Sequence, residues 1–409
     1  MFDYPNKLNI IFDKLYTFGI KPIIVGGYVR DYILHLDSKD IDIELYGLDS
    51  LEVLENILTE FGNVNSVGKS FGVCKLHFDD LELDFSLPRE DSKISAGHKG
   101  FSVVTDKNLD FKTAASRRDF TINAMGYDVK EKKLLDPFNG LQDIDKKILR
   151  AVDINKFAED PLRVLRAIQF SSRFNFKLDE KLLSLLKRLI ETNILTQLPK
   201  ERIFQELQKM FLKSSTPSIG LHLLKKLKLL EYFSFCESYK QVDYFAQHKV
   251  SDNNINTLIF LALVYTKEHL SSLQQLTNKQ KLHTNLILFL DEKEHFDIDD
   301  DSNYALYSLA SRVDIESFLL YMDAYYAGSK KDTIAKLKKK AKALHILHKK
   351  LPALLQGKDL IDFGLSPSKE FSHILLAGYE AQMRGVFSTI EEAREWLQTY
   401  NSLSFIGNN

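Results

Sequence analysis

The chain contains little cysteine, a single tryptophan and no long apolar run. Its only cysteines, Cys74 and Cys236, exclude a disulfide framework and a zinc site built from cysteines. The longest apolar run, residues 258–265, is far shorter than the roughly 20 residues that span a bilayer. The N-terminus also lacks the charged and apolar regions of a signal peptide. We therefore expect a cytoplasmic protein without a membrane partner.

Two signatures of phosphate chemistry are absent as well. The Gly-Lys pair at 357–358 is not a P-loop, because position 352 is proline and Asp359 follows the lysine instead of serine or threonine. No His-Asp dipeptide occurs, so we do not expect a metal phosphohydrolase domain of that signature.

The composition is that of a soluble globular protein, with 44% hydrophobic and 27% charged residues over 409 positions. This length allows two to four domains. The net charge of −1 is unevenly distributed: residues 1–150 carry −5 and the remainder +4. An acidic, metal-binding head on a mildly basic body would suit a polyanionic substrate.

The stretch that organises the chain begins at residue 23. Residues 23–25 read as a short buried strand, Gly26 and Gly27 break it, and residues 28–36 show the spacing of an amphipathic helix. Two glycines at this point would let backbone amides approach a phosphate at the start of a helix. The alternative is an ordinary turn.

Asp40 and Asp42 follow in a second expected strand, two residues apart, so their carboxylates lie on one face. Adjacent carboxylates repel unless a cation lies between them, and Mg²⁺ takes such oxygen ligands. An exposed polar strand face is the alternative for this pair alone. A glycine turn followed by the aspartate pair predicts an anion cradle facing a metal site, which is what nucleotidyl transfer needs.

The remainder of the first 150 residues mixes helices and strands. We expect helices at 1–20 and 51–61, and a hairpin of two strands at 73–78 and 81–86, which makes this region α/β or α+β. Asp84, in the second hairpin strand, is a candidate third carboxylate or a solvated side chain. Residues 92–111 read as a functional or mobile loop, and residues 134–140 as a strand end and turn.

Arg118, Asp119 and Asn123 would cluster if their segment is helical, because residues four apart share a face. Arginine suits triphosphate oxygens, and aspartate with asparagine suits a ribose hydroxyl. The alternative is a helix capped by Asp119 with exposed arginines.

From Phe157 onward the pattern predicts continuous helix. Asp160 and Pro161 mark one helix start, with Arg163 and Arg166 on the next turns, and Pro199 marks another. Residues 336–350 hold seven lysines on a helical pattern, either a solvated face or a track for RNA phosphates.

These motifs together resemble the family of class II tRNA nucleotidyltransferases and bacterial poly(A) polymerases. The resemblance rests on five motifs in family order: Gly26-Gly27-Tyr28-Val29-Arg30-Asp31, Asp40-Ile41-Asp42, Arg117-Arg118-Asp119-Phe120-Thr121-Ile122-Asn123, Glu159-Asp160-Pro161-Leu162-Arg163, and Glu201-Arg202-Ile203. It implies an α+β fold: a polymerase-β-like nucleotidyltransferase head at 1–150, a helical neck at 151–215, and a helical body and tail at 216–409 that bind tRNA. The family forms monomers or dimers, so the oligomeric state stays open.

The resemblance also assigns roles to residues. It implies that Asp40 and Asp42 hold Mg²⁺, and that Asp84 stands where the family has a third acidic residue. Nucleotide binding falls to three segments: Gly26, Gly27 and Arg30 at the triphosphate; Arg118, Asp119 and Asn123 at phosphate and ribose; Asp160, Arg163 and Arg166 at the incoming base. The helix of Glu201 and Arg202 would buttress the last segment.

Base choice has a simple chemical logic. Cytosine and adenine both carry an exocyclic amine beside a ring nitrogen that accepts a hydrogen bond. Asp160 can accept from the amine while Arg163 donates to the ring nitrogen. Uracil and guanine present a carbonyl and a ring N–H instead, so neither hydrogen bond can form. This mismatch costs on the order of several kcal/mol.

The resemblance leads to an enzyme that adds CCA to the 3′ end of tRNA from CTP and ATP. Alternatives are an A-adding tRNA enzyme, a poly(A) polymerase, and a catalytically silent RNA-binding relative. The intact aspartate pair argues against the silent relative, and near-neutral charge argues against the poly(A) polymerase. The loop at 92–111 argues against a strictly CC-adding enzyme, whereas CCA and A addition are not distinguished.

Overall fold

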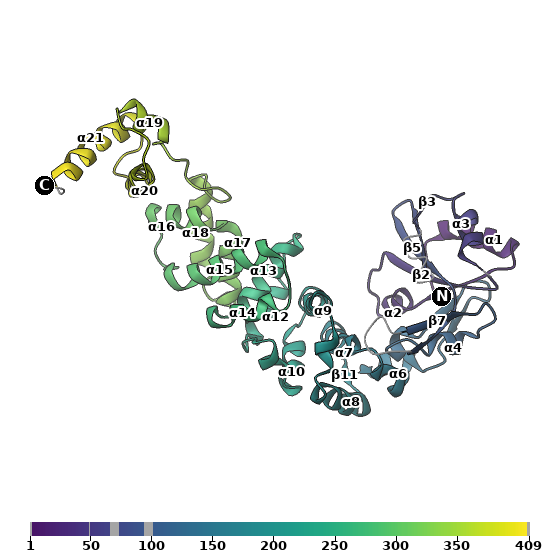
Figure 1. The fold of residues 1–409 in the computed structure, drawn as a ribbon. Coiled ribbons are helices and arrows are strands. Elements are labelled where there is room, and N and C mark those ends of the chain that lie inside the picture. The colour runs from purple at the N-terminus through teal and green to yellow at the C-terminus, as the bar shows by residue number, and fades with distance from the viewer. Residues whose placement is uncertain (1, 49, 66–72, 94–100, 407–409) are drawn as a thin grey trace. The chain divides into compact units, whose positions relative to one another are not determined.

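The computed structural model describes residues 2–48, 50–65, 73–93 and 101–406. The described chain divides into two compact units, residues 1–229 and 230–409, whose elements are labelled in Figure 1. The first unit holds the strands and the second is helical. The expected α+β class, with a mixed head and a helical remainder, is thereby confirmed.

A seven-stranded sheet forms the head. Its spatial order is β3-β4-β5-β2-β1-β8-β9, in which β2 and β5 run parallel and the other neighbours antiparallel. The strands span Lys21–Val25 (β1), Asp40–Tyr46 (β2), Asn63–Asn65 (β3), Val73–Phe78 (β4), Leu81–Ser86 (β5), Gly126–Asp128 (β8) and Lys133–Leu135 (β9). The predicted hairpin is therefore confirmed with the bounds expected for both strands.

Short helices pack against this sheet. The expected N-terminal helix is the 3₁₀ turn Asn6–Leu8 followed by α1 (Asn9–Thr17), which contacts β1, and α3 (Leu51–Leu58) contacts β4. Helix α2 (Gly27–Ile33) contacts both β1 and β2. It ends earlier than predicted, and its amphipathic face is different: Val29, Arg30 and Asp31 are buried, whereas Leu36 lies beyond the helix and is 43% exposed. The buried charges bond to each other, which the hydrophobic spacing did not show.

Two further expectations for the head are corrected. The stretch predicted as loop contains the antiparallel strands β6 (Arg89–Lys93) and β7 (Phe101–Thr105); the glycine-bearing residues 97–100 lie outside the described residues. The segment of Arg118 to Asn123 is not an α-helix. Helix α4 (Phe111–Ala115) ends before it, and only Thr121–Asn123 forms a 3₁₀ turn.

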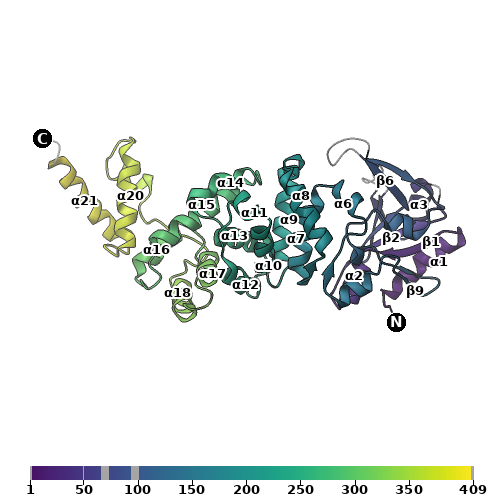
Figure 2. The same cartoon turned by 90° about the horizontal axis from the view of Figure 1, so that it is seen from below.

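The rest of the first unit is mostly helical (Figure 2). Its helices are α5 (Gly140–Asp145), α6 (Ile154–Ala158), α7 (Leu162–Phe174), α8 (Glu180–Glu191), the 3₁₀ turn Ile194–Gln197, α9 (Lys200–Leu212), α10 (Ser218–Lys226) and the start of α11 (Leu229–Tyr232). Helix α7 packs along α9 and α10. The expectation of unbroken helix is wrong at one point, because β10 (Ile148–Leu149) and β11 (Lys177–Leu178) pair in parallel.

The second unit is built from helices around an aromatic core. They are α12 (Tyr239–Ala246), α13 (Asn253–Val264), the 3₁₀ turn Lys267–His269, α14 (Leu270–Gln274), α15 (Gln280–His295), α16 (Asn303–Arg312), α17 (Ile315–Tyr325), α18 (Lys331–Ala343), α19 (Gly357–Asp362), α20 (Glu370–Met383) and α21 (Ile390–Ile406). Phe260, Phe289, Phe318 and Tyr321 are buried where α13, α15 and α17 meet.

Helix α18 carries only part of the predicted lysine run. It ends at Ala343, so Lys349 and Lys350 lie outside it. None of the described helices combines the length and apolarity that a bilayer crossing needs.

Candidate active site

The aspartate pair lies on β2 as predicted. Asp40 and Asp42 are exposed, whereas the alternating Ile41 and Ile43 are buried, so the pleat separates a polar face from an apolar one. The parallel register of β2 and β5 places Asp84 opposite Asp42. Three carboxylates therefore gather on two neighbouring strands.

The surroundings of Asp42 disfavour its charged form. Desolvation by the surrounding protein raises the pKa of Asp42, and the nearby charges of Asp84 and Asp40 raise it further, while Arg118 acts in the opposite direction. Asp84 accepts hydrogen bonds from Nζ of Lys75 at 2.9 and 2.8 Å. The ionised form of Asp42 is thus disfavoured unless a cation joins the site.

One backbone amide of the glycine turn is used within the protein. The N–H of Gly26 donates to the carbonyl of Met125 at 3.1 Å, so this amide is already bonded within the protein. Gly26 has a φ of +71°, and a Cβ there would lie 2.6 Å from Nη1 of Arg118. Position 26 requires glycine for two reasons: any other residue is strained at this positive φ, and a Cβ would collide with the guanidinium of Arg118.

Arg30 lies in a buried network instead of extending into solvent. Its Nη2 lies 2.7 Å from Oδ1 of Asp31, and its Nη1 donates to Oδ1 of Asn123 at 2.5 Å. The guanidinium carbon lies 5.2 Å from the ring centre of Phe170. Burial lowers the pKa of Arg30, and Asp31 opposes that shift.

Asp119 and Asn123 cluster as predicted, although the segment is not an α-helix. The side-chain nitrogen of Asn123 donates to Oδ1 of Asp119 at 2.9 Å, and Nε of Arg166 donates to Oδ2 at 2.7 Å. Burial opposes ionisation of Asp119, but Arg166 and Asn123 outweigh it and lower its pKa. Asp119 does not cap a helix; it links the head to α7.

The expected base-reading pair lies at the start of α7: Asp160 precedes the helix and Arg163 is in its first turn. Oδ1 of Asp160 accepts from the backbone N–H of Leu162 at 3.0 Å, as at a helix start. The guanidinium of Arg163 donates to the carbonyls of Lys156 at 2.9 Å and Arg117 at 2.6 Å. Two carbonyls thus fix the arginine's plane.

A cavity of about 370 Å³ brings these segments together. Its lining contains Asp42 and all the predicted nucleotide-binding residues, together with Phe170: Gly26, Gly27, Arg30, Asp42, Arg118, Asp119, Asn123, Asp160, Arg163, Arg166 and Phe170. Asp40 and Asp84 are not among the lining residues. Residues separated by more than 140 positions thereby face one open, polar space.

Comparisons with known proteins show which family the chain resembles. Residues 23–150 match the poly A polymerase head domain, and residues 175–236 match the family described as a probable RNA and SrmB-binding site of polymerase A. A CCA-adding enzyme of Francisella tularensis subsp. tularensis (strain FSC 198) is 32% identical over 253 residues, which cover 60% of this chain and 67% of that protein. The chain belongs to the poly(A) polymerase and tRNA nucleotidyltransferase family.

Other members of this family are similar over different spans. A multifunctional CCA protein of Neisseria gonorrhoeae (strain NCCP11945) is 35% identical over 243 residues, 58% of this chain. The chain spans just over half, 56%, of that relative's length. The crystal structure of the Bacillus stearothermophilus CCA-adding enzyme in complex with CTP superposes with a TM-score of 0.80 at 21% identity, covering 99% of this chain and all of that one.

The donor set of this family member can be tested against magnesium. Within the residues that the structure describes, no group of three or more metal-ligating side chains is arranged to hold an ion. Mg²⁺ is commonly held by one or two carboxylates together with substrate phosphates and waters. Asp40 and Asp42, exposed on one face of β2, fit that requirement.

Sequence reasoning missed Glu44, two residues beyond Asp42 on the same strand face. Its side chain is buried, accepts from the hydroxyl of Tyr46 at 2.6 Å, and lies 3.3 Å from Nη2 of Arg117 and 3.5 Å from Nη2 of Arg118. Continuing the period of two from the aspartate pair would have drawn attention to it.

Glu206 was missed as well. It is buried on α9, and its charge adds to the larger effect of Asp119 in raising the pKa of Arg166 against the effect of burial. The expected buttress, Glu201 with Arg202, sits at the start of the same helix, where Glu201 is exposed. A carboxylate among the apolar positions Ile203, Leu207 and Met210 was the available signal.

Proposed function

We propose that the chain is a nucleotidyltransferase that adds CCA to the 3′ end of tRNA, using CTP and ATP and releasing pyrophosphate. The observation that carries the proposal is the cavity in which Asp42, Arg118 and the pair Asp160 and Arg163 meet. One carboxylate for a metal, cations for a triphosphate and a donor–acceptor pair for a base face one space. The names of the relatives support the same activity.

The chemistry follows from the placement of the side chains. Asp40 and Asp42 would hold Mg²⁺, which when bound lowers the pKa of the attacking 3′-hydroxyl and neutralises the leaving pyrophosphate. Arg118 lies between Glu44 and Asp42 and presents positive charge where the triphosphate must lie. Arg30 and Gly27 line the same wall.

The ribose and the base would be held by the segments that contain Asp119 and Asp160. Oδ1 of Asp119 accepts from Asn123 and from the N–H of Phe120, and its Oδ2 faces Nε and Nη2 of Arg166. A ribose hydroxyl would therefore bond to Asp119 by displacing one of these donors. Asp160 uses Oδ1 at the helix start. Its Oδ2 would accept a hydrogen bond from the exocyclic amine of C or A. The guanidinium of Arg163, held by two carbonyls, would donate one to the ring nitrogen.

We further propose the head at 1–150, the neck at 151–215, and a body and tail at 216–409 that bind tRNA. The matched RNA-binding region at 175–236 supports RNA contact by the neck and the beginning of the body. The cytoplasmic location and the choice of monomer or homodimer stay predictions.

The test is an addition assay with tRNA ending at the discriminator base, at C and at CC, each with one nucleoside triphosphate and Mg²⁺. We expect two additions with CTP on the first substrate, one with CTP on the second and one with ATP on the third. The Asp42→Asn chain, which lacks one of the two proposed metal ligands, serves as the inactive control.

Other product patterns would contradict the proposal in distinct ways. Addition of A to the CC end alone would identify an A-adding enzyme, and long A tails on an unrelated RNA would identify a poly(A) polymerase. No product, with tRNA binding retained, would indicate a silent relative.

A further inference from the structure

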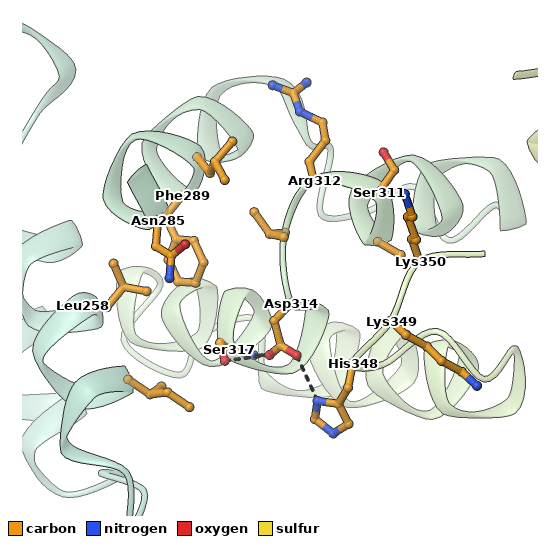
Figure 3. A pocket seen from close by; sticks show the side chains of 14 residues that line it. Leu258, Asn285, Phe289, Ser311, Arg312, Asp314, Ser317, His348, Lys349 and Lys350 are labelled. Carbon is orange, nitrogen blue, oxygen red and sulfur yellow. Dashed lines mark hydrogen bonds and ion pairs between the residues drawn. The ribbon is translucent and has the colours of Figure 1, made fainter. Parts of the chain in front are cut away.

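The second unit contains a cavity of about 330 Å³ that the proposed reaction does not use. It opens between α13, α15 and the loop that joins α16 to α17, and residues 348–350 complete its edge (Figure 3). Cavities that hold small ligands typically begin at about 300 Å³. This one is therefore large enough for a ligand of nucleotide size.

The floor of the cavity is apolar. Leu258 of α13 and Phe289 of α15 are buried there, and Leu288 and Val313 are partly buried beside them. Phe289 is held by the ring of Phe318, whose centre lies 5.6 Å away. The floor is thus rigid. The ring of Phe289 is only 3% exposed, so a base would pack against the partly exposed aliphatic side chains of Leu288 and Val313.

One polar group interrupts this floor. Asn285 lies one turn before Phe289 on α15, and Figure 3 shows its amide beside that ring. Among the residues that the structure describes, no group forms a hydrogen bond with the Asn285 side chain. A side-chain amide presents a donor and an acceptor side by side, the pattern that pairs with the N6 and N7 edge of adenine.

Cationic side chains lie on one side of the cavity. Arg312, Lys349 and Lys350 line it (Figure 3). Nε of Arg312 pairs with Oε1 of Glu292 at 2.6 Å, whereas neither lysine has an ion-pair partner within the described part of the chain. The single carboxylate on the lining, Asp314, is already used: it caps α17 by accepting from Ser317, and it bonds to Nδ1 of His348 at 2.9 Å. The two lysines are thus available to an anion.

We propose that this cavity binds a purine nucleotide, with the base on the apolar floor at Asn285 and the phosphate at Lys349 and Lys350. The ligand is a free nucleotide or an unpaired nucleotide of a bound RNA, which share this chemistry. Floor, amide and cations match the base, its edge and its phosphate. The site is formed by the second unit alone and does not depend on the proposed function of the head.

The experiment is photolabelling of the full chain, with peptide mapping by mass spectrometry. The probes are 8-azidoadenosine 5′-monophosphate and an unstructured oligoribonucleotide carrying one 8-azidoadenosine. We expect saturable labelling of peptides from residues 253–264 or 280–295. If the mononucleotide labels these peptides and the oligonucleotide does not compete with it, the ligand is a free nucleotide. If only the oligonucleotide labels them, the ligand is RNA.

Two variants test the contacts. Asn285→Leu keeps the branched shape of the side chain and removes the amide, and Lys349→Ala with Lys350→Ala removes the charge. Each should reduce labelling of these peptides about tenfold, the effect of losing one good hydrogen bond or ion pair. Labelling of all other peptides, measured in the same sample, serves as the internal standard, and equal melting temperatures show that the fold is retained. The matched control replaces Lys281 and Lys358, two exposed lysines of the same unit, by alanine.

Three results would overturn the proposal. The first is no saturable labelling of these peptides by either probe. The second is labelling that either variant leaves unchanged or that the control reduces as strongly. The third is competition by a phosphorylated peptide as strong as that by AMP, which would mean that the cavity recognises phosphate without a base.

Discussion

At the scale of single residues, the head cavity holds charges that the fold tolerates for the sake of binding. Asp42 faces two other carboxylates, and Arg118 is the cation that partly offsets them. Arg118 is itself crowded against Gly26 and held by Glu44. Such opposed charges in one cleft are typical of functional sites.

Asp42→Asn should abolish nucleotide addition, lowering turnover at least about a thousandfold, because it removes a proposed metal ligand. It should also raise the free energy of unfolding at pH 7 without divalent ions. The pKa of Asp42 is higher in the folded state than in the unfolded state. Ionisation of Asp42 therefore destabilises the fold as the pH rises above the pKa of the unfolded state. Asparagine does not ionise, so the substitution removes this loss. Denaturant unfolding with chelator and an addition assay measure the two outcomes.

The matched control is Asp37→Asn, at an exposed position on the loop before β2, which should leave both quantities unchanged. Near-normal turnover of the Asp42→Asn chain would rule out the metal site.

Arg163→Ala should lower the ratio of kcat/KM for CTP over UTP by about tenfold to a hundredfold, the range of one lost discriminating contact. Its donor would no longer pair with cytosine or repel the ring N–H of uracil. Triphosphate binding should change less, because Arg30 and Arg118 line the cavity independently.

The ratio is measured on tRNA ending at the discriminator base. An unchanged ratio with uniformly lower activity would show that Arg163 serves only to join the carbonyls of Lys156 and Arg117.

At the scale of elements, β2 performs two tasks with one pleat. Ile41, Ile43 and Leu45 fill the core, while the other face carries Asp40 and Asp42 at the cavity end and the buried Glu44 further along. The buried carboxylate faces the two arginines of the segment that follows α4. The same strand thus presents the aspartates and positions the arginines.

Glu44→Gln should lower the free energy of unfolding by about 3 kcal/mol, the loss expected when one partner of a buried ion pair is removed. It should raise KM for CTP and ATP more than it lowers kcat, since Arg118 loses its support. Urea unfolding and steady-state kinetics measure both.

Glu52→Gln, at an exposed position of α3, is the control for the same chemical change. Loss of stability with unchanged KM would make Glu44 a structural residue without influence on the nucleotide.

At the scale of the whole molecule, positive charge on the second unit is less available than the sequence suggested. On α18, Lys336 lies 2.5 Å from Asp301, and Lys338 lies 2.5 Å from Glu316. Lys339 and Lys342 are exposed. The proposed contact with tRNA therefore depends on a few lysines and not on the whole run.

Replacing Lys338, Lys339 and Lys342 by glutamate should weaken tRNA affinity and reduce the slope of log affinity against log salt by about two units. Lys338 is already paired with Glu316, and loss of a phosphate contact at each of the other two lysines removes about one released counterion. Filter binding over a range of salt concentrations measures the slope.

The control carries the same charge change at the exposed Lys281, Lys358 and Lys369 of the same unit. An equal slope in both triple variants and the parent would leave α18 as a solvated face.

The sequence by itself determined the elements whose signals are local. The strands of the β4–β5 hairpin, the aspartate pair on β2 and the helix that begins after Pro199 were predicted with their positions. Alternation, turn residues and proline act within a few positions, so their effects can be read along the chain.

Only the tertiary structure decided how these elements combine. The parallel pairing of β2 with β5 sets Asp84 beside Asp42, and no turn between the two strands fixes that register. The bond from Gly26 to Met125, the contact of Glu44 with Arg118 and the field of Glu206 on Arg166 all join distant segments. A buried donor or charge needs a complementary partner, and the fold can bring that partner from any part of the chain. The spacing of residues along the sequence therefore does not reveal which residue it is.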